Sequence, residues 1–133
     1  MLVVPRGVER LSASRVVVAW KNTMQSRRAI SDAMTFLKLA EAVHVVRVTD
    51  DGDRVELDDV VAYLGLHGVK AEGVLKAPNG GGTAETLLEA TETYKADLIV
   101  SGAFGYSRLR EWFFGGVTRN LLDHSPVCCL MSH

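Results

Sequence analysis

Three glycines with a characteristic spacing are the strongest chemical signal in this sequence. Two residues separate Gly102 from Gly105, and nine residues separate Gly105 from Gly115. An apolar run, residues 98–101, precedes them, and a helix-like run, residues 117–124, follows. A strand, a glycine-rich loop and a helix start turn backbone N–H groups toward an anion. We interpret this stretch as a cradle for the phosphates of a nucleotide; the plainer alternative is that the glycines only serve turns.

Basic and aromatic side chains lie inside the same stretch. Arg108 and Arg110 either reach the phosphates or form a solvated loop face. The aromatic run, residues 112–114, either lines a base pocket or, as we favour, packs the loop on the sheet or on a partner.

Other kinds of chemistry have little support in the sequence. The four histidines are scattered, and no spacing of His, Cys and Asp indicates a metal cage. Asp50, Asp51 and Asp53 read as a polar turn, with a contact to Mg²⁺ as the alternative. Residues 78–82 lack the Gly-Lys-Ser/Thr ending of a phosphate-binding P-loop, and we interpret them as a linker. We therefore predict no catalytic residue and no metal ligand.

The composition bounds the class of protein. The 133 residues are 47% hydrophobic and 23% charged, with a formal net charge of −1, which is typical of one globular domain. So small a charge gives no field to attract nucleic acid or an anionic membrane. No apolar run approaches the roughly 20 residues of a membrane span. We expect no nucleic-acid partner and no membrane contact.

The two cysteines and the first residues bear on the compartment. Cys128 and Cys129 are adjacent in an apolar run, where neighbours on a strand point to opposite faces and do not bridge. We expect two reduced, buried thiols and a cytoplasmic protein. The start, residues 1–5, is too short for a signal-peptide core and has no basic lead.

The order of apolar patterns predicts the fold class. Continuous apolar runs predict strands covered on both faces, at residues 15–20, 43–48, 69–76, 98–101 and 126–131. Helical periodicity lies between them, with these residues on the buried faces: Ile30, Ala33, Met34, Leu37, Leu57, Val60, Val61, Leu64, Leu87, Ala90 and Tyr94. This alternation predicts an α/β fold, a parallel sheet with helices on both faces and ligands at the carboxyl ends of the strands.

Local signals predict where the helices begin. Asn22 or Thr23 is able to cap the first helix, and Thr83 starts the third. Asp53 and Glu56, three residues apart, resemble a capping box for the second.

From about residue 15 onward the chain resembles the universal stress protein family. The glycine pattern is similar to the family's ATP-binding signature, Gly-x-x-Gly-x9-Gly-[Ser/Thr]. The flanking residues 96–100 and 125–127 agree with it. Residues 2–5 resemble the closing strand of a preceding repeat, so the chain resembles the second half of a tandem member. We expect residues 1–14 to form an N-terminal arm or an edge strand and residues 15–133 to form the domain.

The resemblance implies a fold, a ligand and an assembly. The fold is a five-stranded parallel sheet of order 3-2-1-4-5, Rossmann-like and similar to the adenine nucleotide alpha hydrolases. The ligand is an adenine nucleotide, ATP with Mg²⁺. The assembly is a homodimer that pairs the last strand, from Val127 to Met131. The nucleotide-binding residues that it implies, together with neighbours on the adjoining loops, are Ala19, Trp20, Lys21, Val45, Val46, Gly102, Gly105, Arg108, Gly115, Gly116, Val117 and Thr118.

Two positions depart from the family pattern and keep other functions open. Gly116 stands where the signature has Ser or Thr, and Lys21 stands where ATP-binding members usually carry Asp. We expect a nucleotide-binding regulator of the stress response. The alternative is a member that has lost nucleotide binding and acts as a dimeric interaction module. A slow ATPase ranks last because no residue stands out as a general base.

Overall fold

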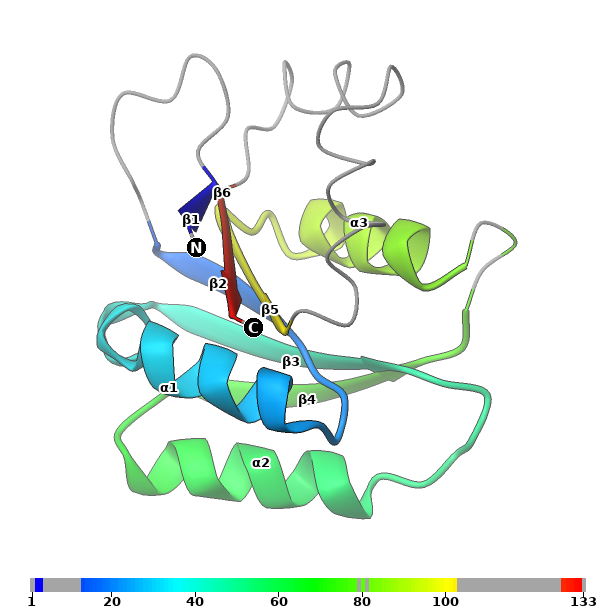
Figure 1. The fold of residues 1–133 in the computed structure, drawn as a ribbon, viewed down its shortest axis with the longest axis horizontal. Coiled ribbons are helices and arrows are strands. Elements are labelled where there is room, and N and C mark those ends of the chain that lie inside the picture. Colours follow the sequence, from blue (N-terminus) through cyan, green and yellow to red (C-terminus); the bar gives the residue numbers. More distant parts are fainter. Residues whose placement is uncertain (1, 4–12, 79, 81, 103–127, 133) are drawn as a thin grey trace.

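The described residues form one sheet with helices on both of its faces (Figure 1). The computed structural model describes residues 2–3, 13–78, 80, 82–102 and 128–132. Along the chain the elements are β1 (Leu2–Val3), β2 (Arg15–Ala19), α1 (Met24–Leu39), β3 (Ala42–Val48), α2 (Val55–Leu66), β4 (Ala71–Lys76), α3 (Thr83–Thr93), β5 (Leu98–Gly102) and β6 (Cys128–Ser132).

The strand order confirms the predicted topology. Across the sheet the order is β1-β6-β5-β2-β3-β4, and the five strands from β6 to β4 are parallel. Numbered along the chain from β2, this is the order 3-2-1-4-5 that the family resemblance implies. β2 lies in the centre, with β3 on one side and β5 on the other. The carboxyl ends of β2, β3 and β5 therefore meet at one edge of the sheet.

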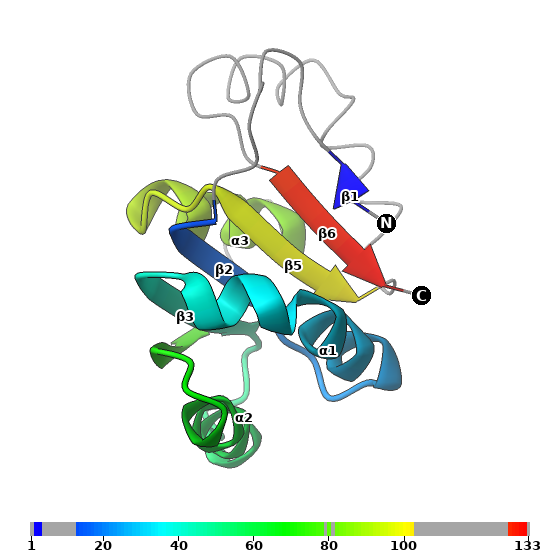
Figure 2. The same cartoon turned by 90° about the vertical axis from the view of Figure 1, so that its left-hand side faces the viewer.

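Alternate residues of the strands pack into two separate hydrophobic cores, one on each face of the sheet. Val16, Val18 and Val45 pack beneath α1 and α2, whereas Val17 and Val46 pack beneath α3. Both views show α1 and α2 on one face of the sheet and α3 on the other (Figures 1 and 2). Burial on both faces explains why these strands are continuous β-branched runs and not alternating ones.

The helices bury the faces that the periodicity predicts. Ile30, Ala33 and Leu37 of α1 are buried, as are Leu57 and Leu64 of α2. α3 buries Leu87 and Ala90, with Tyr94, just past its end, packed against the same core. Thr23 caps α1, because its side-chain oxygen accepts a hydrogen bond from the Ser26 amide at 3.1 Å.

The predicted capping box at the start of α2 is wrong. The N-cap residue is Arg54, whose side chain makes no capping hydrogen bond. Asp53 instead accepts a hydrogen bond from the Val55 amide, 2.9 Å away, and Asp51 accepts one from the Asp53 amide. These carboxylates form a polar turn. Glu56 is directed away from the turn toward Arg47, 2.9 Å from its carboxylate.

Asp97 fixes the start of β2 beside the start of β5. Its two carboxylate oxygens accept hydrogen bonds from the backbone amides of Ser14 and Arg15, each at 3.1 Å. The Arg15 side chain in turn donates to the Tyr94 carbonyl at 2.7 Å. These contacts hold the central strands in register from their amino ends.

The outer strand β1 runs antiparallel to β6 at one edge of the sheet (Figure 2). Residues 2–3 form an edge strand, and residues 4–12 of the expected N-terminal arm lie outside the described part of the chain. No helix within the described residues is long and apolar enough to cross a membrane.

Candidate functional site

The carboxyl ends of β2 and β3 enclose a small hollow. Its volume is about 140 Å³. Four of the predicted site residues line it, together with four others: Ala19, Trp20, Lys21, Val46, Arg47, Val48, Thr49 and Leu87. Such an edge, where loops leave neighbouring strands of an open α/β sheet, is where ligands bind in folds of this class.

The local sequence explains how the hollow forms. The Trp20 amide donates to the Val46 carbonyl at 2.9 Å, which extends the pairing of β2 with β3 by one residue. Ala19, Val46 and Leu87 are apolar and belong to the core beneath α3, so they give the hollow an apolar floor. Lys21 and Thr49, at the next loop positions, give it a polar rim.

Other predicted residues lie elsewhere. Val45 is fully buried in the core beneath α1 and α2, and its side chain does not line the hollow. It points to the opposite layer from Val46, because successive residues of a strand face opposite sides. Gly102 ends β5. The remaining predicted residues lie outside the described part of the chain: Gly105, Arg108, Gly115, Gly116, Val117 and Thr118.

Gly102 has a packing role that the sequence did not reveal. A Cβ at this position would lie 2.7 Å from the Ser26 nitrogen and 2.8 Å from the Gln25 carbonyl carbon, both backbone atoms. The end of β5 therefore touches the first turn of α1. The missing side chain serves this contact, and the glycine-rich stretch starts from a point fixed against α1.

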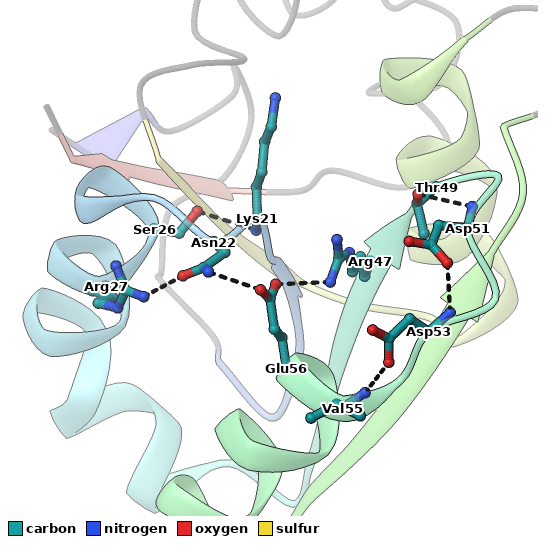
Figure 3. Close-up of polar contacts among 10 residues, drawn as sticks. All are labelled: Lys21, Asn22, Ser26, Arg27, Arg47, Thr49, Asp51, Asp53, Val55 and Glu56. Atoms are coloured by element: carbon teal, nitrogen blue, oxygen red, sulfur yellow. Dashed lines mark hydrogen bonds and ion pairs between the residues drawn. The ribbon is translucent and has the colours of Figure 1, made fainter.

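A chain of polar contacts crosses the same edge of the sheet (Figure 3). Arg27 donates to the Asn22 side-chain oxygen, and Asn22 donates to Glu56 at 2.9 Å. Glu56 also accepts a hydrogen bond from Arg47, again at 2.9 Å. The network ties the β2–α1 loop, α1, β3 and α2 together. Its ion pair joins residues nine positions apart, a contact that no local sequence pattern predicts.

The side chain of Lys21 points away from Glu56 (Figure 3). Its backbone amide donates to the Ser26 hydroxyl at 3.3 Å, which anchors the loop to the first turn of α1. The position that the family pattern assigns to an acid thus carries a cation at the rim of the hollow.

Trp20 separates the hollow from a larger cavity on the other face of the sheet. That cavity, of about 530 Å³, lies between α1 and α2 and is lined by Trp20, Asn22, Arg27, Ile30, Glu56, Asp59, Val60 and Tyr63. Trp20 is 6% exposed, and its indole N–H is buried with no hydrogen-bond partner among the described residues. The Arg27 guanidinium lies 6.0 Å from the centre of the Trp20 ring. Trp20 is the one predicted site residue among the residues that line this cavity.

The described residues hold no group of three or more His, Cys, Asp or Glu side chains arranged to bind a metal ion. His44 lies in β3 and stacks on Tyr94, with ring centres 3.8 Å apart. Burial lowers the pKa of its imidazole, against an opposing effect of Glu72, whose carboxylate lies 3.7 Å away. This histidine belongs to the core beneath α3 and lies outside both hollows.

A family model and solved structures match the chain. Residues 78–133 match the model of the universal stress protein family. No curated protein matches the chain.

Three solved structures have the same fold. A universal stress protein from Archaeoglobus fulgidus is 23% identical, with a TM-score of 0.64, over 90% of this chain and 43% of its own. One from Burkholderia pseudomallei is 24% identical, with a TM-score of 0.63, over 90% and 95%. A universal stress protein in complex with cAMP is 23% identical, with a TM-score of 0.63, over 92% and 98%. This chain thus spans less than half of the A. fulgidus chain and nearly all of the other two. The resemblance that the glycine spacing predicts is confirmed.

Proposed function

We propose that this chain, a universal stress protein by its C-terminal match and its fold, binds an adenine nucleotide of the ATP class and regulates a stress response. The observation that supports this most is the hollow at the carboxyl edge of β2 and β3. It brings Ala19, Trp20, Lys21 and Val46 together, as the family resemblance implies. One structural neighbour is a universal stress protein in complex with cAMP, which is an adenine nucleotide, and this supports the proposal.

The size of the hollow implies that it binds only one part of the ligand. Its 140 Å³ is below the roughly 300 Å³ at which small-molecule pockets begin, so it accepts one part of a nucleotide. The apolar floor of Ala19, Val46 and Leu87 suits the base or the ribose. The phosphates, with Mg²⁺, would then lie toward the glycine-rich stretch that begins at Gly102, on the other side of β2.

The glycine-rich stretch would bind phosphate through its backbone. In this proposal Gly105, Gly115 and Gly116 bring N–H groups to the phosphates, and the helix that the sequence predicts for residues 117–124 would add its positive end. Arg108 adds charge, and Thr118 supplies the nearest hydroxyl to the position where the family has one. The loss of one hydrogen bond to a charged phosphate at Gly116 costs about 1.5–3 kcal/mol.

Thermal unfolding with and without nucleotide tests the proposal. ATP or cAMP, with and without Mg²⁺, is added to the protein at up to millimolar concentration, and calorimetry measures the heat of binding. A ligand at one hundred times its dissociation constant stabilises the folded state by about 2.7 kcal/mol. The absence of both a shift in Tm and a heat of binding at millimolar nucleotide would exclude the proposal.

A pair of charge variants tests whether the hollow is the site. Lys21→Asp reverses the charge at the rim of the hollow. Lys70→Asp makes the same change just before β4, at the opposite edge of the sheet, where the parallel strands begin. We expect Lys21→Asp to change nucleotide affinity and Lys70→Asp to leave it unaltered. Equal affinities for both variants and the parent would place the nucleotide elsewhere.

The second candidate function is that of an interaction module without nucleotide. Gly116 and Lys21, at the two positions that depart from the family pattern, favour it.

In either function we propose a homodimer through the last strand, and a cytoplasmic location that suits the two unpaired, buried thiols. An ATP turnover above that of a Gly105→Val variant would indicate a slow ATPase instead.

A further inference from the structure

The outer edge of β6 is partly covered by the chain's own N-terminal strand. β1 pairs antiparallel with β6, with Leu2 opposite Leu130 and Val3 opposite Cys129. The inner edge of β6 pairs with β5 along all five residues of both strands. The outer edge is therefore the one that can accept a further strand, and the described residues of β1 cover two of its five positions.

β1 covers backbone groups that a symmetric strand pair needs. β6 runs from Cys128 to Ser132, so its midpoint is Leu130. Two copies of β6 that pair antiparallel about a two-fold axis near this midpoint use the backbone groups of the central residues in both strands. The Cys128 amide donates to the Asp97 carbonyl, so Cys128 and Leu130 direct their backbone groups to β5 and Cys129 directs its groups outward. β1 already occupies the outward groups of Cys129. β1 and the β6 strand of a second copy cannot both bind there.

We propose that β1 is a displaceable cap on the dimerisation edge, so that two copies of this chain pair through β6 only when β1 has left it. This inference rests on the proposed pairing of last strands. The occupant of the uncapped edge is the β6 strand of a second copy. The cap also blunts the edge of the folded monomer, because a short edge strand offers little template for uncontrolled pairing.

The lengths of the strands make the cap weak. Within the described residues β1 contributes two residue pairs, whereas β6 of a second copy has five residues to offer. Backbone hydrogen bonds dominate strand addition of this kind, so the longer partner makes more of them. β1 has the advantage of belonging to the same chain, and the second copy gains with protein concentration. Self-association of the parent chain is therefore expected only at high concentration.

Proline and alanine variants of β1 separate the backbone of the cap from its side chains. Leu2→Pro with Val3→Pro removes both amide donors, and one of these two adjacent residues must lie in the hydrogen-bonded type of antiparallel pair. Leu2→Ala with Val3→Ala keeps both donors and shortens the same side chains. Proline is tolerated in edge strands, and circular dichroism and a urea midpoint check that both variants remain folded.

Sedimentation over a range of concentrations decides between the outcomes. We expect the double-proline variant to dimerise with a dissociation constant at least about tenfold lower than that of the parent, and the double-alanine variant to stay within about threefold of the parent. Hydrogen exchange at Cys129, whose amide faces the outer edge, should be fast in the dilute proline monomer and slow in its dimer. A proline variant that stays monomeric overturns the proposal, as does a parent that dimerises just as tightly.

A third result would also overturn it. A parent dimer that the double-proline variant abolishes would mean that β1 is exchanged between subunits and joins them. Nucleotide binding provides a separate readout. If ATP shifts the Tm of both variants while neither dimerises, the cap is refuted and the nucleotide proposal stands.

Discussion

Replacement of Gly102 by alanine is expected to destabilise the protein at the very edge where the hollow lies. The added Cβ would lie 2.7 Å from the Ser26 nitrogen and 2.8 Å from the Gln25 carbonyl carbon. Comfortable contacts between heavy atoms begin at about 3.5 Å, so β5 and α1 must separate by about 0.8 Å. Both contacted atoms are backbone, so no side-chain rotation relieves the overlap.

The expected cost follows from overpacking. Extra methyl groups forced into a well-packed site cost about 1–3 kcal/mol. The lower chain entropy of alanine in the unfolded state returns about 0.4–1 kcal/mol of this. We therefore expect the free energy of unfolding to fall by about 1–2 kcal/mol, read as a lower urea midpoint with an unchanged slope.

Gly65→Ala is the matched control. Gly65 lies inside α2, and a Cβ there meets nothing within 4 Å. The same substitution should stabilise the protein by about 0.5–1 kcal/mol, because glycine is a poor helix former. If Gly102→Ala were as stable as the parent while Gly65→Ala gained stability, the close approach of β5 to α1 would be refuted.

Three further predictions concern local contacts. Thr23→Ala should lower the free energy of unfolding by about 1 kcal/mol through loss of the α1 cap, while Thr35→Ala on the exposed face of α1 should not; equal urea midpoints would contradict the capping role. Asp97→Ala should cost about 1 kcal/mol by leaving the two backbone amides at the start of β2 without this acceptor, and Asp97→Asn less; an unchanged midpoint would exclude this anchor. Burial lowers the pKa of the His44 imidazole below 6.5, so the unfolded chain binds more protons as the pH falls. The contribution of His44 to the free energy of unfolding should be fully present above about pH 6.5 and be lost as the pH falls below it. His44→Phe, which keeps an aromatic ring beside Tyr94, should remove the part of the acid destabilisation that is due to His44.

The core of the fold follows from local sequence because its signals are strong and redundant. The valine run at residues 16–18 has no polar break, and only a strand buried on both faces accommodates it. Leu87 and Ala90 repeat at helical spacing and are buried, as predicted. The order of the strands came from the family resemblance, since local patterns do not state which strands are neighbours.

The site follows from the sequence less completely, because it depends on contacts between distant elements. Glu56 has the spacing of a capping box but contacts Arg47 on the neighbouring strand, where a guanidinium offers a better partner than a backbone amide. Gly102 reads as a ligand-binding glycine, and its contact with α1 becomes visible only when β5 and α1 lie together. Val45 and Val46 differ by one position, and the pleat sends them to opposite layers.

The adjacent cysteines offer a separate view of how the two layers open. Cys128 packs beneath α1 and α2, and Cys129 packs in the core beneath α3. Burial raises the pKa of both thiols, that of Cys129 to about 12, so neither is reactive until its own layer loosens. A thiol-specific reagent under native conditions would therefore time the partial unfolding of each helical layer independently, from two neighbouring positions on a single strand.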